Sequence, residues 1–102
     1  MTIRDWLSTR TPPPPAALRA RIDDALGDRA NAPAANALAE NVAAAEALLR
    51  ELLARPTTGR ESALDLLAVD ALITYAFEAA ADDPMNLAAG ARASMVRLSA
   101  LA

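Results

Sequence analysis

Apolar residues recur every three to four positions along most of this chain, which is the spacing of amphipathic α-helices. The longest run, residues 63–84, carries apolar side chains over an arc of roughly 220° when 100° is allotted to each residue. So wide an arc predicts a central helix that its neighbours enclose on most of its circumference. The large side chains expected to be buried in it are Leu64, Leu66, Leu72, Ile73 and Phe77.

The remaining wedge of this central helix is polar. Asp70, Thr74 and Glu78 follow one another at i, i+4 spacing, and Asp65 lies in the first turn, where the helix dipole favours an acid. Acids within the run make a membrane span implausible, so we expect no membrane partner. The strip should face water or a protein.

Two further helices are predicted before the central one. The first covers about residues 15–26 and ends at Gly27, since glycine is the usual residue just past a helix end. The second covers about residues 33–54 and stops before Pro56. Its apolar face is predicted to be Leu38, Val42, Ala45, Leu48, Leu49, Leu52 and Leu53.

Capping signals mark the starts of the last two helices. Residues 58–61, Thr-Gly-Arg-Glu, have the form of a capping box and open the central helix. Asp83 before Pro84 is an N-cap followed by proline at the first helical position, so the last helix is predicted from Pro84 almost to the end. Its packing stripe is predicted to be Leu87, Ala91, Met95 and Leu98.

The amino-terminal residues form a separate short helical arm. Thr2 to Asp5 resemble a capping box with Asp in place of Glu, and Ile3, Trp6 and Leu7 share one helix face. A helix of about two turns is unstable alone in water, so the arm must dock. The possible sites are its own bundle, a second copy, or another protein.

Four consecutive prolines separate the arm from the rest of the chain. They fix φ and remove four backbone donors, which predicts a stiff polyproline spacer. The predicted organisation is an arm (residues 1–11), a spacer (residues 12–15) and a helical bundle (residues 16–102). Since the connections are short, the fold class expected is all-α, a compact antiparallel bundle of four helices preceded by the arm and spacer.

The composition agrees with helices and limits the chemistry. The chain has 28 alanines and 15 leucines but only three aromatic residues, and it contains neither Cys nor His. The commonest general base and the commonest transition-metal ligands are therefore missing. The net charge of -3 argues against a nucleic-acid partner, because binding a phosphate backbone requires a basic surface. Alanine-rich packing also argues against an internal ligand pocket, because short side chains let helices close together.

Asp82, Asp83 and Asn86 carry oxygens of the kind that Mg²⁺ prefers. A cap pair before the helix-starting Pro84 explains the same residues. We therefore predict that the protein is not an enzyme and that it has no catalytic residue, metal site or cofactor. The amino terminus places Arg4 where a secretion signal would be apolar, so a cytoplasmic location is expected.

The function expected is a non-enzymatic protein-interaction module that self-associates as a homodimer or is a subunit of a larger assembly. Tryptophan is enriched at interface hot spots, which favours the arm as an interface. The alternatives are a small regulatory adaptor or anti-sigma-like inhibitor that uses its acidic strip toward a basic partner, and a small all-α enzyme or apolar-ligand carrier. The candidate partner-binding residues are Ile3, Trp6, Leu7, Asp70, Thr74 and Glu78.

Overall fold

The helices follow the apolar periodicity of the sequence. In the computed structural model, which describes residues 1–55, 59–82 and 87–101, they are α1 (Ile3–Leu7), α2 (Ala16–Leu26), the 3₁₀ turns η1 (Gly27–Asn31) and η2 (Ala34–Asn36), α3 (Ala37–Ala54), α4 (Arg60–Ala81) and α5 (Leu87–Ser99). Those described residues contain no β-strand. The radius of gyration, 13.2 Å, is that of a compact domain of this length. The all-α class is confirmed.

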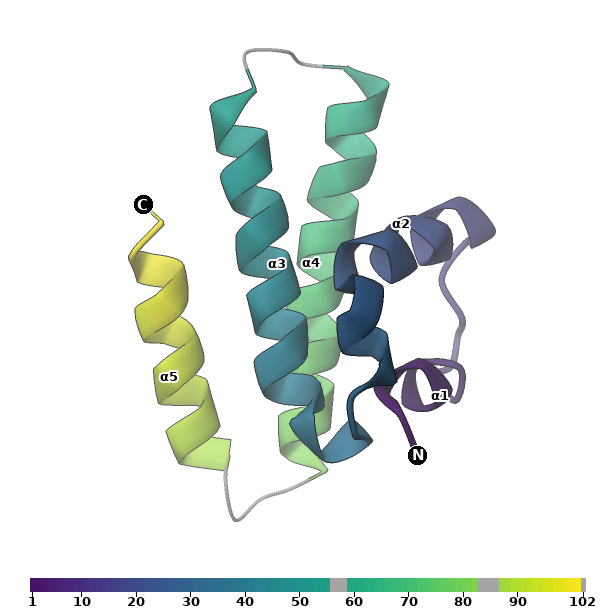
Figure 1. Cartoon of the computed structure of the whole chain (residues 1–102), viewed down its shortest axis with the longest axis vertical. Helices are drawn as coiled ribbons and strands as arrows, with labels where there is room; N and C mark the ends of the chain where they lie inside the picture. Colours follow the sequence, from purple (N-terminus) through teal and green to yellow (C-terminus); the bar gives the residue numbers. More distant parts are fainter. Residues whose placement is uncertain (56–58, 83–86, 102) are drawn as a thin grey trace.

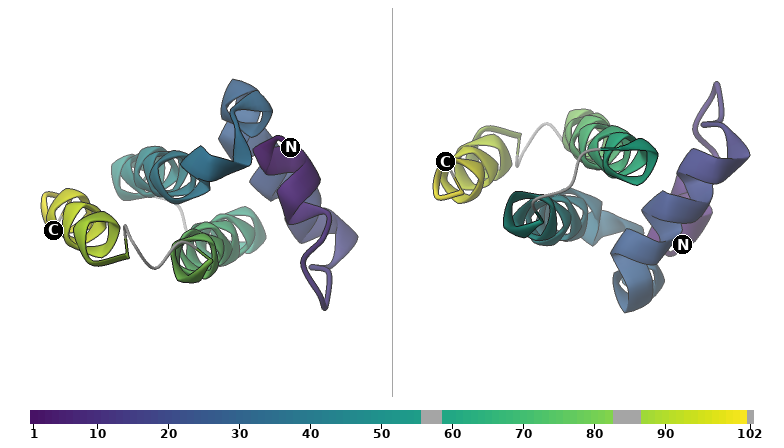
Figure 2. Two further views of the ribbon diagram at one scale, coloured as in Figure 1. Left: turned by 90° about the horizontal axis from the view of Figure 1, so that it is seen from below. Right: turned by 90° about the horizontal axis from the view of Figure 1, so that it is seen from above.

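The long helices α3 and α4 run antiparallel at the centre of the molecule (Figure 1). Helix α5 runs beside them, whereas α2 crosses α4 at a steep angle (Figure 1). Figure 2 shows α1 and α2 on one side of the α3–α4 pair and α5 on the other. A bundle of four antiparallel helices is thus not confirmed, because α2 does not run alongside the other three.

Small side chains hold α3 and α4 together. Alanines dominate the buried positions of both helices, and Leu48 and Leu72 fill the space between. Alanine permits a short distance between helix axes, near the lower end of about 8–10 Å. The nearly inaccessible alanines are Ala37, Ala44 and Ala45 on α3 and Ala68, Ala76 and Ala80 on α4.

The segment between α2 and α3 differs from the prediction. Helix α3 begins at Ala37 rather than near Pro33, and residues 27–36 form two 3₁₀ turns. The arm accounts for the difference, because it takes backbone groups on both sides of Pro33. The Ile3 N–H donates to the Ala32 carbonyl and the Ala34 N–H donates to the Met1 carbonyl, each at 2.9 Å.

The burial expected for several large side chains is wrong. Leu66 and Phe77 on α4 are 55% and 36% exposed, and Met95 on α5 is 57% exposed. Leu72 is inaccessible, as expected, while Ile73 is only partly buried. The cause is the arrangement of neighbours: α3, α2 and the arm cover one side of α4, and α5 leaves part of the other side open. Leu53, in the last turn of α3, is exposed as well.

Several predicted helix boundaries fall on residues that the structure does not describe. Thr58 of the second capping box, Pro56 and the Asp83–Pro84 start of the last helix lie outside the described ranges. Gly59 occupies the N-cap position of α4. Over the described ranges, no helix combines the length and apolarity needed to cross a membrane.

Candidate functional site

The arm packs against its own chain. Ile3, Trp6 and Leu7 are 0%, 8% and 3% exposed and share the hydrophobic core with Leu72. The predicted capping box of α1 is confirmed: the Asp5 N–H donates to Thr2 Oγ1, and the Thr2 N–H donates to the Asp5 carboxylate, both at 3.2 Å. In this conformation the three apolar arm residues offer no free face to a partner.

Trp6 makes two directional contacts, one with Arg10 of the arm and one with Tyr75 of α4. The guanidinium carbon of Arg10 lies 4.3 Å from the indole centroid, a cation–π geometry. The Tyr75 ring meets the indole edge-on, with centroids 6.3 Å apart and planes at 86°. Burial, and secondarily the charge of Glu78, raises the pKa of Tyr75, so its phenol stays protonated at neutral pH.

The acidic strip of α4 lies next to these aromatic residues. Asp70, Thr74 and Glu78 are exposed, and Asp82 continues the row at the same spacing. The first three line a hollow of about 270 Å³; its remaining lining residues are Arg10, Thr11, Pro12, Ala71 and Tyr75. The structure thus brings the predicted strip against the end of the arm and the first residue of the spacer. The Thr74 hydroxyl donates to the Asp70 carbonyl at 2.9 Å, so it is used within the helix.

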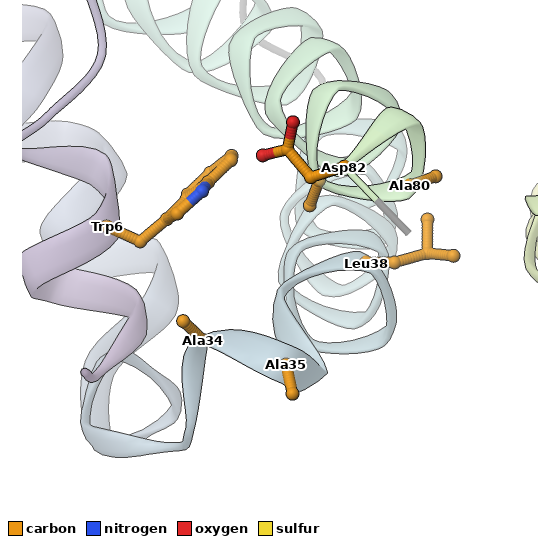
Figure 3. Close-up of a pocket in the computed structure, with 7 residues that line it drawn as sticks. Trp6, Ala34, Ala35, Leu38, Ala80 and Asp82 are labelled. Atoms are coloured by element: carbon orange, nitrogen blue, oxygen red, sulfur yellow. The ribbon is translucent and has the colours of Figure 1, made fainter. Parts of the chain in front are cut away.

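A larger cavity of about 430 Å³ opens beside Trp6. It lies between the arm, η2 and the end of α4, and Figure 3 shows the indole as one wall with the Asp82 carboxylate beside it. The other lining residues are Ala34, Ala35, Leu38, Ala79 and Ala80. Alanine-rich packing was expected to leave no pocket. Here the helices diverge, and the same short side chains leave the space unfilled.

Asp65 forms an ion-pair cluster that the sequence did not reveal. Its side chain is 6% exposed, and its two oxygens each accept a hydrogen bond at 2.5 Å, one from Arg21 Nε of α2 and one from Arg55 Nη2 after α3. Burial alone would raise the pKa of Asp65, but the two guanidinium hydrogen bonds outweigh it and lower that pKa. The sequence signal that could have indicated this cluster is the position of Asp65, a carboxylate on the buried side of α4. Its partners are 44 and 10 residues away, so spacing could not identify them.

Comparisons with known proteins supply no family for this chain. The chain matches no protein-family model, and no curated protein and no solved structure matches it. Any functional proposal must therefore come from the geometry of the molecule itself.

The described residues also contain buried polar atoms without a hydrogen-bond partner, and they contain no candidate metal cluster. Asn41 on α3 is inaccessible, and neither its amide nitrogen nor its oxygen has a hydrogen-bond partner within the described ranges. An unpaired buried amide destabilises a fold by about 1–3 kcal/mol. No group of three or more carboxylates gathers among residues 1–55, 59–82 and 87–101 in a way that would hold a metal ion.

Proposed function

We propose that this protein is a non-enzymatic interaction module that associates with a second copy of itself through the outer faces of α4 and α5. The observation that carries the proposal is an apolar stripe on α4. Leu66, Ile73 and Phe77 fall within about 40° of one another on the helix. Leu66 and Phe77 are 55% and 36% exposed although they are large and apolar. Contiguous exposed apolar surface of this kind is typical of interfaces.

Helix α5 adds a second exposed apolar face. Met95 and Val96 are 57% and 67% exposed. Arg97 on the same helix reaches Glu46 of α3 at 2.7 Å. Met95 projects from α5 about 160° away from Arg97, so it lies on the flank turned away from that ion pair. The α4–α5 side therefore carries most of the large apolar side chains that the fold leaves in water.

The charges beside these faces are complementary. Asp70 borders the α4 stripe, and Arg92 lies on the exposed side of α5 near Val96. Neither side chain has an ion-pair partner within the described part of the chain. In a two-fold symmetric dimer the same patch serves both copies, so Asp70 of each copy can meet Arg92 of the other. The α4–α5 pairs of the two copies would then pack as four helices.

Sedimentation velocity over a concentration series tests the proposal. The wild-type chain should sediment as a dimer, and Phe77→Gln should shift it toward the monomer because it removes the largest side chain of the apolar stripe. Leu53→Gln is the matched control, since Leu53 is 66% exposed but lies at the far end of α3, outside this surface. A wild-type monomer at every concentration would contradict self-association.

A charge exchange sharpens the test. Asp70→Arg and Arg92→Asp should each weaken the dimer, and the double variant should recover the wild-type association if the two side chains meet across the interface. If the double variant associates no more strongly than the weaker of the two single variants, Asp70 and Arg92 do not meet and the interface lies elsewhere.

A second candidate is binding of a basic partner at the acidic strip. It is favoured by the hollow in which Asp70, Thr74 and Glu78 come together. Binding of a lysine-rich peptide should fall with salt and with the paired change Asp70→Asn and Glu78→Gln. Phe77→Gln should leave that binding unchanged, which distinguishes this function from self-association.

A further inference from the structure

We infer that the cavity beside Trp6 is a binding site for small organic ammonium ions with an apolar body. The cavity, of about 430 Å³, falls within the usual size range of small-ligand sites. It is lined by residues of the arm, η2, the first turn of α3 and the end of α4 (Figure 3), and none of these residues belongs to the apolar stripe of α4 or to α5. This inference does not depend on self-association.

The walls require an apolar ligand body. Apart from Asp82, the lining consists of the Trp6 indole, four alanines and Leu38. These side chains offer no hydroxyl, amide or guanidinium to a strongly hydrated ligand. A ligand gains free energy here mainly by removing apolar surface from water.

One negative charge specifies the polar end of the ligand. Among the described lining residues, Asp82 is the single ionisable side chain, and its carboxylate lies beside the indole (Figure 3). It has no hydrogen bond or ion pair with another side chain of the described ranges. An ammonium group can pair with it, and the negative face of an indole ring also attracts cations. A ligand carboxylate would be repelled.

The stability of α4 does not explain the position of Asp82. Asp82 is the C-cap of α4, where the dipole of a helix disfavours an acid. An amide at this position would suit the helix end better. Asp82→Asn should therefore keep the fold intact, which makes it a clean probe of the site.

Trp6 supplies the readout, because it is the only tryptophan of the chain. The probes are cyclohexylmethylamine, an alkyl amine that is protonated at pH 7, and cyclohexylmethanol, which has the same carbon skeleton without the charge. We expect the amine to change Trp6 fluorescence with a dissociation constant of about 1 mM. The amine should bind about three- to tenfold tighter than the alcohol.

Variants locate the binding. Asp82→Asn should bring the affinity for the amine to within about twofold of that for the alcohol. Ala35→Leu should weaken binding of both probes, because it fills the cavity from η2. Asp24→Asn is the matched control: Asp24 is an exposed acid of α2 outside the cavity, and its loss should change neither affinity.

Three results would overturn the inference. The first is equal affinity of the wild-type protein for the amine and the alcohol. The second is an Asp82→Asn variant that binds the amine as tightly as the wild type. The third is the absence of saturable fluorescence change with the amine up to about 10 mM. Circular dichroism of each variant shows that the helices are retained, and the Asp82→Asn result decides the matter if Ala35→Leu fails to fold.

Discussion

The two sides of the α3–α4 pair differ in how their helices are attached. On one side the five-residue helix α1 buries all three of its large apolar side chains. On the other side the thirteen-residue helix α5 leaves Met95 and Val96 mostly in water. Helix length is therefore a poor guide to attachment in this molecule. How firmly a helix is attached depends more on the number of its side chains and backbone groups that have contact partners.

The contacts of each side explain the difference. The arm combines apolar burial with two backbone hydrogen bonds to residues 32–34 and the aromatic contacts of Trp6. For α5, the side-chain tie within the described residues is the ion pair of Arg97 with Glu46, which also accepts a hydrogen bond from Arg50. Exposed ion pairs of this type contribute only about 0–1 kcal/mol.

The largest expected effect is on the arm side. Trp6→Ala should lower the free energy of unfolding by about 3–5 kcal/mol, because it removes a large side chain from the core. Met95→Ala on α5 should change it by no more than about 0.5 kcal/mol, since Met95 is 57% exposed. Urea unfolding followed by circular dichroism measures both. Equal effects would remove the contrast between the two sides.

The next effect is expected at the Asp65 cluster, which ties α2 and the end of α3 to α4. Asp65→Asn should destabilise the fold by about 1–3 kcal/mol, because the hydrogen bonds from two guanidinium groups lose their charged acceptor. Asp24→Asn removes an exposed acid of α2 and should be nearly neutral, which controls for the change in net charge. A neutral Asp65→Asn would show that the cluster does not hold these helices together.

The same cluster predicts a dependence on pH. Because the pKa of Asp65 is lower in the folded chain than in the unfolded chain, its contribution is complete above the unfolded value of about 4. The contribution is lost as pH falls through the lower folded value. Unfolding free energies measured from pH 7 to pH 3 should fall less steeply for Asp65→Asn. Asp5 and Glu46, whose pKa values are also lowered, should leave a residual slope.

The smallest effect is expected on α5. Arg97→Ala should lower the global unfolding free energy by less than about 1 kcal/mol. Its local effect should be clearer: amide hydrogen exchange in α5 should accelerate while exchange in α3 and α4 stays unchanged. Arg92→Ala, one and a half turns away and without an ion-pair partner in the described chain, serves as the control when exchange is measured on the monomer, because the proposed dimer would use Arg92. Equal exchange rates in the two variants would mean that Arg97 does not secure α5.

Local signals in the sequence predicted much of this fold. The spacing of apolar residues located the long helices, and the Thr2–Asp5 capping box located the arm. The need of so short a helix to dock was also predictable, because it follows from helix length alone. The partner of the arm could not be predicted, since an apolar face is compatible with any complementary surface.

The remaining differences between prediction and structure concern which helix covers which face of its neighbour. Periodicity ranks the positions around α4, but it does not say that α5 leaves Leu66 and Phe77 exposed. The Asp65 cluster depends on residues distant in sequence, and the Trp6 cavity depends on how three elements diverge. Asp70, Thr74 and Glu78 were expected to form one strip, and the structure places them in one hollow.

The docking of the arm has a consequence for the order in which the protein is made. Ile3, Trp6 and Leu7 are synthesised before their core partner Leu72 and before Tyr75, whose ring packs edge-on against the indole. The burial of these three side chains must therefore wait until α4 has been translated. The apolar side chains of the arm therefore remain exposed to water until α4 has been synthesised. During this interval the chain is most prone to misassembly and to binding by a chaperone.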